Sequence, residues 1–264
     1  MSRIGWSLLG LSCVVALLLL RPLDTNGFAS HPRPAADYDE ALRLVDALRA
    51  ADGPEISPEC RTELLAHGAR TSRVVLLLHG LTNCPAQFDS LGRLAFARGA
   101  NVLIPRLPHH GRADRMTEDL ARTDARELCD FTDRVLDAAC GLGDSVTVVG
   151  LSVGGTLAAW AAVERREVDR AVLIAPLLGV ARARGAWRAP SVRLMHWLPN
   201  VFVWWDAQRR EHLGGPRHVY PRFSTRAVAA TSPWTTRSMR GSSARGARIR
   251  PARSRCMSFP PRSG

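Results

Sequence analysis

Two kinds of segment alternate along the chain. Short continuous apolar runs, typical of strands buried on both faces of a sheet, occur at 74–78, 101–104, 146–149 and 171–174. Between them lie longer stretches whose apolar residues recur three and four positions apart, which predicts helices. These stretches are 38–51, 87–98, 114–140 and 154–166. The alternation predicts an α/β fold with a mostly parallel, doubly wound sheet.

The same pattern divides the chain into four predicted parts. They are an N-terminal hydrophobic segment (1–21), a linker (22–36), one α/β domain (37–231) and an arginine-rich, disordered tail (232–264). A chain of 264 residues is long enough for one such domain with a buried core.

A change of pattern follows Pro176. Residues 179–221 show no strand-like alternation and are rich in large aromatic side chains, namely Trp187, Trp197, Phe202, Trp204 and Trp205. This stretch is interpreted as an apolar lid inserted over a site. Ordinary packing of a helical subdomain is the alternative, and the two interpretations are compatible.

The N-terminal segment is uncharged over residues 4–20 and lies between Arg3 and Arg21. Its length is at the lower limit for a membrane span of roughly 17–25 residues and above the roughly 7–15 residues of a signal-peptide core. An uncleaved membrane anchor or a cleaved signal is predicted, so the protein is expected to be membrane-anchored or exported. A buried first helix is the alternative. Export permits disulfides, and Cys60 with Cys84 is a possible pair.

Charge is concentrated at the C-terminal end. The formal net charge of +12 comes from 36 arginines and no lysine; eleven of the arginines follow Glu211, and no acidic residue does. An arginine-rich tail can bind nucleic acid or anionic lipid. No aromatic residue is interleaved with the arginines between Arg237 and Arg255, and no binding motif accompanies them, so no nucleic-acid partner is expected. Such a composition is also what GC-rich DNA encodes, including when it is read in a wrong frame.

The strongest chemical signal is the Gly-Leu-Ser-Val-Gly segment at 150–154, which joins a predicted strand to a predicted helix. Such a turn forces the serine into a strained backbone conformation, and Gly150 and Gly154 omit the Cβ atoms that would collide there. Ser152 would then lie at the N-terminus of a helix, where N–H groups and the helix dipole stabilise an oxyanion. The motif predicts Ser152 as a nucleophile, with a structural glycine-rich turn as the alternative.

A second signal, His79-Gly80-Leu81, directly follows the first buried strand. Because the carboxyl ends of parallel strands open on one edge of the sheet, this loop is expected to face Ser152. Acyl transfer needs two N–H donors on the developing oxyanion. The N–H groups of Leu81 and Val153 are the predicted donors, with Gly80 supporting the loop. His79 is interpreted as structural and not as the catalytic base.

Other candidates are interpreted as structural. Cys84 lies five residues after His79, so a Cys/His nucleophile is conceivable, but a loop cysteine or half of a disulfide is favoured. The adjacent His109 and His110 resemble a metal pair, yet neighbouring histidines on a loop do not converge as they do at i and i+4 of a helix. No cysteine spacing indicates zinc. No metal or cofactor is expected.

These motifs resemble the α/β-hydrolase superfamily, in the branch of monoglyceride lipases, carboxylesterases and serine aminopeptidases. The resemblance covers roughly residues 70–230. It rests on His79-Gly80, on Pro-Arg-Leu-Pro-His-His-Gly at 105–111 and on the elbow at Ser152. It implies an α/β-hydrolase fold with a helical lid. It also implies hydrolysis of a small acyl, ester or lipid-like substrate through an acyl-enzyme on Ser152.

The family carries its triad acid and histidine after the nucleophile, each following a further strand. After Ser152 this chain offers only Asp169, Asp206, His196, His212 and His218. Asp169 precedes a strand, and the others fall in the predicted lid. The expected acid and base therefore have no matching positions, although His212 or His218 could substitute as a base.

A serine without a base is a poor nucleophile. The alternative function is therefore a non-catalytic, truncated hydrolase-like protein that lacks the triad acid and histidine. A frameshift or truncation near Thr231 is the hypothesis that accounts together for the missing last strands, the loss of acidic residues and the arginine-rich end.

Overall fold

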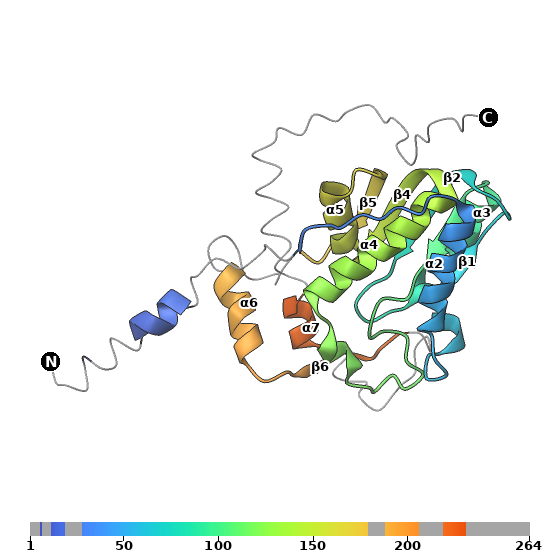
Figure 1. Cartoon of the computed structure of the whole chain (residues 1–264). Helices are drawn as coiled ribbons and strands as arrows, with labels where there is room; N and C mark the ends of the chain where they lie inside the picture. The colour runs from blue at the N-terminus through green and yellow to red at the C-terminus, as the bar shows by residue number, and fades with distance from the viewer. Residues whose placement is uncertain (1–5, 7–11, 19–27, 179–187, 206–218, 231–264) are drawn as a thin grey trace.

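The computed structural model describes residues 6, 12–18, 28–178, 188–205 and 219–230. A five-stranded sheet in the order β1-β3-β2-β4-β5 forms its centre (Figure 1). The strands are β1 (Glu63–Leu65), β2 (Thr71–Leu78), β3 (Asn101–Ile104), β4 (Gly143–Leu151) and β5 (Val168–Ile174). All neighbouring strands pair in parallel except β1, which is antiparallel to β3. The predicted, mostly parallel α/β sheet is confirmed.

Helices cover both faces of the sheet. On one face lie α4 (Ala125–Leu142) and α5 (Val153–Glu164), with α2 (Tyr38–Ala50) beside α4 (Figure 1). The short helices η3 (Pro85–Phe88) and α3 (Asp89–Ala97) cover the other face. Successive side chains of a strand point to opposite faces, so Leu76 and Leu78 join the larger core and Leu77 the smaller one. This two-sided cover explains why the strand sequences are continuously apolar.

The strand β5, unlike β2, is not buried on both faces. Its last three residues, Val172, Leu173 and Ile174, are 47%, 43% and 38% exposed. Within the described residues no strand pairs with the outer edge of β5, which ends the strand order. A sequence suited to an interior strand therefore lies at an open edge.

The helix predicted at 114–140 begins later than expected and also ends slightly later. A short helix, η4 (Asp119–Arg122), comes first, and α4 begins at Ala125. The Asp124 carboxylate caps it by accepting the N–H groups of Arg126 and Glu127. At the other end α4 continues past the predicted end at residue 140, through Gly141 to Leu142. A Cβ there would lie 2.4 Å from the carbonyl O of Asp37, so this glycine permits close helix packing.

The described part of the predicted linker, residues 28–36, packs against the helical layer. Phe28 and Ala35 are buried, and the indole N–H of Trp160 donates to the Phe28 carbonyl (2.8 Å). The N–H of Ala35 donates to the carbonyl of Asp137 in α4 (3.0 Å). This segment was predicted to be a linker. In the structure its backbone and the Phe28 side chain pack against α4 and α5.

The described part of the predicted lid region contains one helix and one strand. Its described elements are α6 (Arg188–Trp197) and β6 (Phe202–Trp204); β7 (Arg222–Ser224) and α7 (Thr225–Ala230) follow. The antiparallel pair of β6 and β7 was not expected, because three-residue strands are too short to show an alternating pattern. Ala227 of α7 is buried in the larger core. Trp187 and the tail at 232–264 lie outside the described residues.

At the N-terminus, residues 12–18 are helical and exposed. Among the described residues no helix is both long and apolar enough to cross a bilayer. Most other residues of the apolar run at 4–20 lie outside the described set.

Candidate active site

Ser152 occupies a sharp turn between β4 and α5. Its backbone has φ 56° and ψ −113°, a conformation that L-residues rarely adopt. The two flanking glycines make this turn sterically possible. A Cβ at Gly150 would lie 2.0 Å from the carbonyl O of Gly154, and a Cβ at Gly154 would lie 1.9 Å from the carbonyl O of Leu78. The strand-turn-helix geometry expected of a nucleophile elbow is therefore present.

Backbone hydrogen bonds hold this turn in place. The N–H of Ser152 donates to the carbonyl of Ile174 at the end of β5 (2.9 Å). The Ser152 carbonyl accepts the N–H groups of Thr156 and Leu177 (3.0 Å each). The main chain of Ser152 is thus engaged on both sides, and its partly exposed side chain lies at the carboxyl edge of the sheet.

The loop after β2 lies against the elbow. The N–H of Gly154 donates to the carbonyl of His79 (3.2 Å). A Cβ at Gly80 would lie only 3.6 Å from the Cβ of Ser152. Neither Leu81 nor Val153 donates its N–H to another residue that the structure describes. Two N–H groups with no described acceptor therefore lie in the segments that meet at a partly exposed serine, and an oxyanion hole needs two such donors.

His79 is buried behind this loop, and both ring nitrogens have partners. Nδ1 donates to the carbonyl of Gly80 (3.0 Å), and Nε2 accepts the N–H of Leu107 (3.0 Å). Burial lowers the pKa of His79 well below its usual value, and the neighbouring His110 lowers it further. A neutral imidazole with both nitrogens occupied supports the loop and does not reach the Ser152 hydroxyl.

The adjacent histidines of the next loop turn to different partners. Nε2 of His109 lies 2.7 Å from a carboxylate oxygen of Glu127. His110 is buried and bonds through Nδ1 to the carbonyl of Pro108 (2.6 Å); burial lowers its pKa to about 4. Because their rings do not converge, the two histidines do not form a metal-binding pair. Within the described residues no group of three metal-ligating side chains occurs.

Among the residues that the structure describes, no acid of a triad lies at Ser152. The carboxylate of Asp169 accepts the N–H of Val146 (2.8 Å), at the amino end of β4, whereas Ser152 follows the carboxyl end. Asp206, His212 and His218 lie outside the described residues, and only the backbone of His196 is described. No described histidine or carboxylate hydrogen bonds to the Ser152 hydroxyl.

Comparison with protein families gives a match over most of the chain. The model of the alpha/beta hydrolase family matches residues 75–260. The chain belongs to the alpha/beta hydrolase family. The resemblance inferred from the elbow and the loop after the first buried strand is thereby confirmed.

Three solved structures are similar to this chain, and the first of them supports the assignment of the fold. One belongs to the metagenome-derived lipolytic enzymes LipS and LipT, with 20% identity, a TM-score of 0.52 and coverage of 70% of this chain and 72% of that one. Others are a monoacylglycerol lipase of Paleococcus ferrophilus (16% identity, TM-score 0.49, 69% and 72%) and a monoglyceride lipase of Saccharomyces cerevisiae (16%, 0.48, 67% and 65%). The search of curated proteins gave no match.

Several contacts around the site of this hydrolase were not predicted. The side chain of Gln87 accepts the N–H of Gly80 (2.9 Å). Thr82 accepts the N–H of Tyr220 at its carbonyl (2.8 Å) and the indole N–H of Trp205 at its hydroxyl (3.1 Å). Gln87 belongs to the helix η3, and Trp205 and Tyr220 belong to the predicted lid region. No local sequence pattern indicates contacts between these segments and the loop after β2.

Proposed function

We propose that this alpha/beta hydrolase is a serine hydrolase of carboxylic esters that acts through an acyl-enzyme on Ser152. The observation that carries the proposal is the positive-φ elbow at Ser152, packed against Gly80. In this proposal the N–H groups of Leu81 and Val153 bind the oxyanion of the tetrahedral intermediate.

The proposed reaction has two steps. Ser152 Oγ attacks the ester carbonyl carbon as its proton passes to a base, and a tetrahedral oxyanion forms. The oxyanion then collapses to the acyl-enzyme as the C–O bond to the alcohol breaks, and the alcohol leaves with the proton held by the base. Water then attacks the acyl carbon, releases the acid and returns a proton to Oγ. His212 or His218 would be the substitute base. We expect slow turnover, because loss of a triad member removes several orders of magnitude of rate.

The proposed substrate class is a small acyl, ester or lipid-like molecule. It is supported by the described lid region, where large apolar side chains are exposed at Leu194, Trp197, Leu198, Val201 and Trp205. Apolar walls with few polar groups are typical of sites for such ligands.

A second candidate function is a non-catalytic hydrolase-like protein. Two observations favour it: Asp169 lies at the wrong end of the sheet for a triad acid, and the outer edge of β5 is apolar and open. The elbow would then be an inherited feature that binds a ligand or nothing.

Labelling of the full chain with a fluorophosphonate probe decides between the two candidates, because covalent reaction needs an activated serine. For the hydrolase we expect labelling that disappears in Ser152→Ala and persists in Ser145→Ala, which alters a serine near the other end of β4. An unlabelled wild-type protein would instead support the non-catalytic function. For a labelled protein, p-nitrophenyl esters of increasing acyl length then test the substrate class.

We also propose that the protein is exported or membrane-anchored through residues 4–20. The apolar run supports this location, and so does the disulfide between Cys60 and Cys84, since disulfides persist in oxidising compartments. Cell fractionation with thiol alkylation tests it: a cytoplasmic protein whose Cys60 and Cys84 react with the alkylating agent would contradict the proposal.

A further inference from the structure

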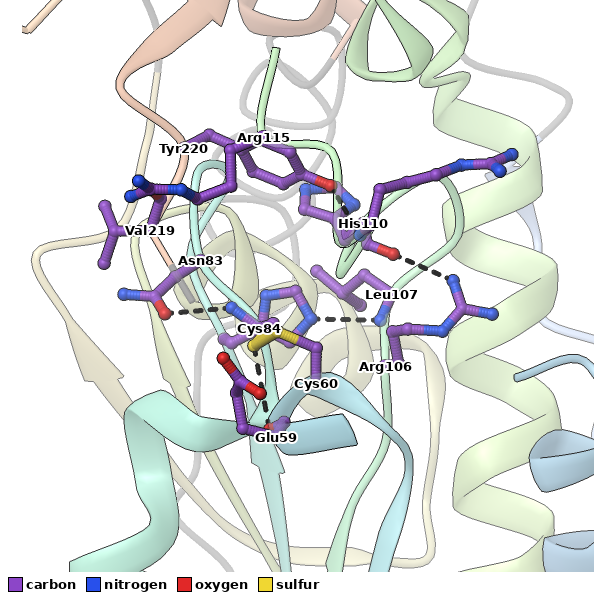
Figure 2. The surroundings of a disulfide bond; sticks show 12 residues. Glu59, Cys60, Asn83, Cys84, Arg106, Leu107, His110, Arg115, Val219 and Tyr220 are labelled. Atoms are coloured by element: carbon purple, nitrogen blue, oxygen red, sulfur yellow. Dashed lines mark hydrogen bonds between the residues drawn. A yellow bond between two sulfur atoms is a disulfide. The ribbon is translucent and has the colours of Figure 1, made fainter. Parts of the chain in front are cut away.

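The loop that carries Leu81 is covalently tied to a segment outside the elbow. Cys84, three residues after Leu81, forms a disulfide with Cys60, with 5.1 Å between their Cα atoms (Figure 2). Both cysteines are buried and pack with Ile56 in a small core of their own. The bridge is therefore a fixed internal contact of the loop and not a surface link.

The Cys60 end of the bridge is firmly anchored. The N–H of Ser57 donates to the carbonyl of Gly111 (2.9 Å), and the N–H of Ala113 donates to the carbonyl of Glu55 (3.0 Å). Gly111 has φ 79°, and a Cβ there would lie 2.9 Å from the Cβ of Cys60. The segment before Cys60 is thus held tightly against the loop that follows β3.

A buried ion pair strengthens the same anchor. Arg106 bonds through Nε to the carboxylate of Asp52 (2.5 Å) and through Nη1 to the carbonyl of His110 (3.0 Å; Figure 2 shows Arg106 and His110). The other oxygen of Asp52 accepts the N–H of Thr62 (2.6 Å). Residues on both sides of Cys60 are therefore fixed to the loop after β3.

The Cys84 end of the bridge is coupled to Leu81 by a tight turn. The N–H of Asn83 donates to the carbonyl of Gly80 (3.1 Å), and the Asn83 side chain accepts the N–H of Cys84 (2.9 Å). Because β2 ends at Leu78, no ladder hydrogen bond holds these residues. A displacement of Cys84 would therefore move the Leu81 N–H.

We propose that Cys60 and Cys84 are positioning residues: their disulfide holds the Leu81 N–H where it meets the oxyanion formed on Ser152. This inference rests on the proposed function. Without the bridge the loop keeps the packing of Leu81 in the larger core, the hydrogen bonds of His79 and those to Gly80 and Thr82, and none of these ties Cys84 to the segment before β1. An oxyanion donor acts through its exact placement, and its loss costs roughly 100-fold or more in rate.

The test compares the full-length wild type with the double variant Cys60→Ala/Cys84→Ala, below the unfolding temperature of both. Cys129→Ala is the matched control, since Cys129 is a buried free cysteine in α4. Two quantities are measured: the fluorophosphonate labelling rate of Ser152, and amide hydrogen exchange in a peptide covering residues 79–88.

We expect labelling of the double variant to slow by about tenfold or more and exchange in 79–88 to rise by about tenfold, with exchange in β2 and β4 unchanged. A phosphine reductant should slow labelling and raise exchange in 79–88 of the wild type. It should change neither quantity in the double variant, which has no bridge to reduce. Reoxidation should restore the labelling rate of the wild type. The Cys129→Ala control should match the wild type.

The possible failures are distinguishable. Unchanged exchange in 79–88, or an equal rise in every segment, would overturn the positioning role, because the bridge would then matter only to global stability. Unchanged labelling despite a loosened loop would overturn it as well. If the wild type is not labelled at all, the proposed hydrolase function fails, and the proposed role in oxyanion binding falls with it.

Discussion

Arg165 holds together the helical layer that supports the elbow. Its side chain is fully buried at the end of α5, the helix that begins directly after Ser152. It forms ion pairs with Asp133 (2.8 Å) and Asp137 (2.6 Å) of α4 and with Glu167 (3.1 Å). The N-terminal segment reaches the same carboxylates, because the N–H of His31 donates to Asp133 and that of Arg33 to Asp137.

Replacement of Arg165 by Met keeps much of the side-chain volume and removes the charge. Asp133 and Asp137, whose side chains are each 8% exposed, would lose their shared cation. Removing one partner of a buried ion pair costs about 3–5 kcal/mol. Against a typical stability of about 5–15 kcal/mol this is a large fraction. We expect the unfolding midpoint to fall by roughly 10 °C.

The loss should depend on pH. Burial raises the pKa of Asp137 even though Arg165 opposes the shift, so removing Arg165 should raise it further. A carboxyl group with a raised pKa in the folded state binds a proton that the unfolded chain does not bind. Its destabilising effect therefore grows as the pH rises through that pKa and shrinks as the pH falls.

Urea unfolding, followed by circular dichroism at about pH 8 and about pH 5, measures both effects. Arg166→Met is the control, because Arg166 is the adjacent, exposed arginine. A loss for Arg165→Met below about 1 kcal/mol, or one that equals the control, would refute the reasoning. A loss of the same size at both pH values would refute the part that concerns Asp137.

The remaining predictions concern the elbow and its surroundings. Gly154→Ala should abolish labelling of Ser152 and destabilise the fold by about 3 kcal/mol in urea unfolding, because the new Cβ meets the Leu78 carbonyl. Asp169→Asn should leave the labelling rate unchanged, since this carboxylate lies at the other end of β4; a loss of labelling would contradict that placement. Burial holds the pKa of His110 near 4, so wild-type stability should fall as the pH drops below the ordinary histidine value. His110→Gln should reduce that fall in pH-dependent thermal melts.

The sequence alone was sufficient for the elements whose signals are local. The strands β2 and β4 follow from continuous apolar runs, because helices bury both of their faces. The elbow follows from the spacing of Gly150, Ser152 and Gly154. A Cβ at Gly150 would collide with the backbone of Gly154, and a Cβ at Gly154 would collide with the backbone at the end of β2. The α/β class and the candidate nucleophile were predictable for this reason.

Contacts between distant segments were decided only by the tertiary structure. Cys60 and Cys84 are 24 residues apart, and their pairing depends on how the segment before β1 folds against the loop after β2. The packing of residues 28–36 depends on α4, about a hundred residues away. Asp169 was expected to precede a strand, but it lies at the start of β5, and only the pairing of β4 with β5 places it at the opposite end of the sheet from Ser152. Local spacing determines which backbone a segment adopts, but the neighbours of a side chain are set by segments that the chain brings together only on folding.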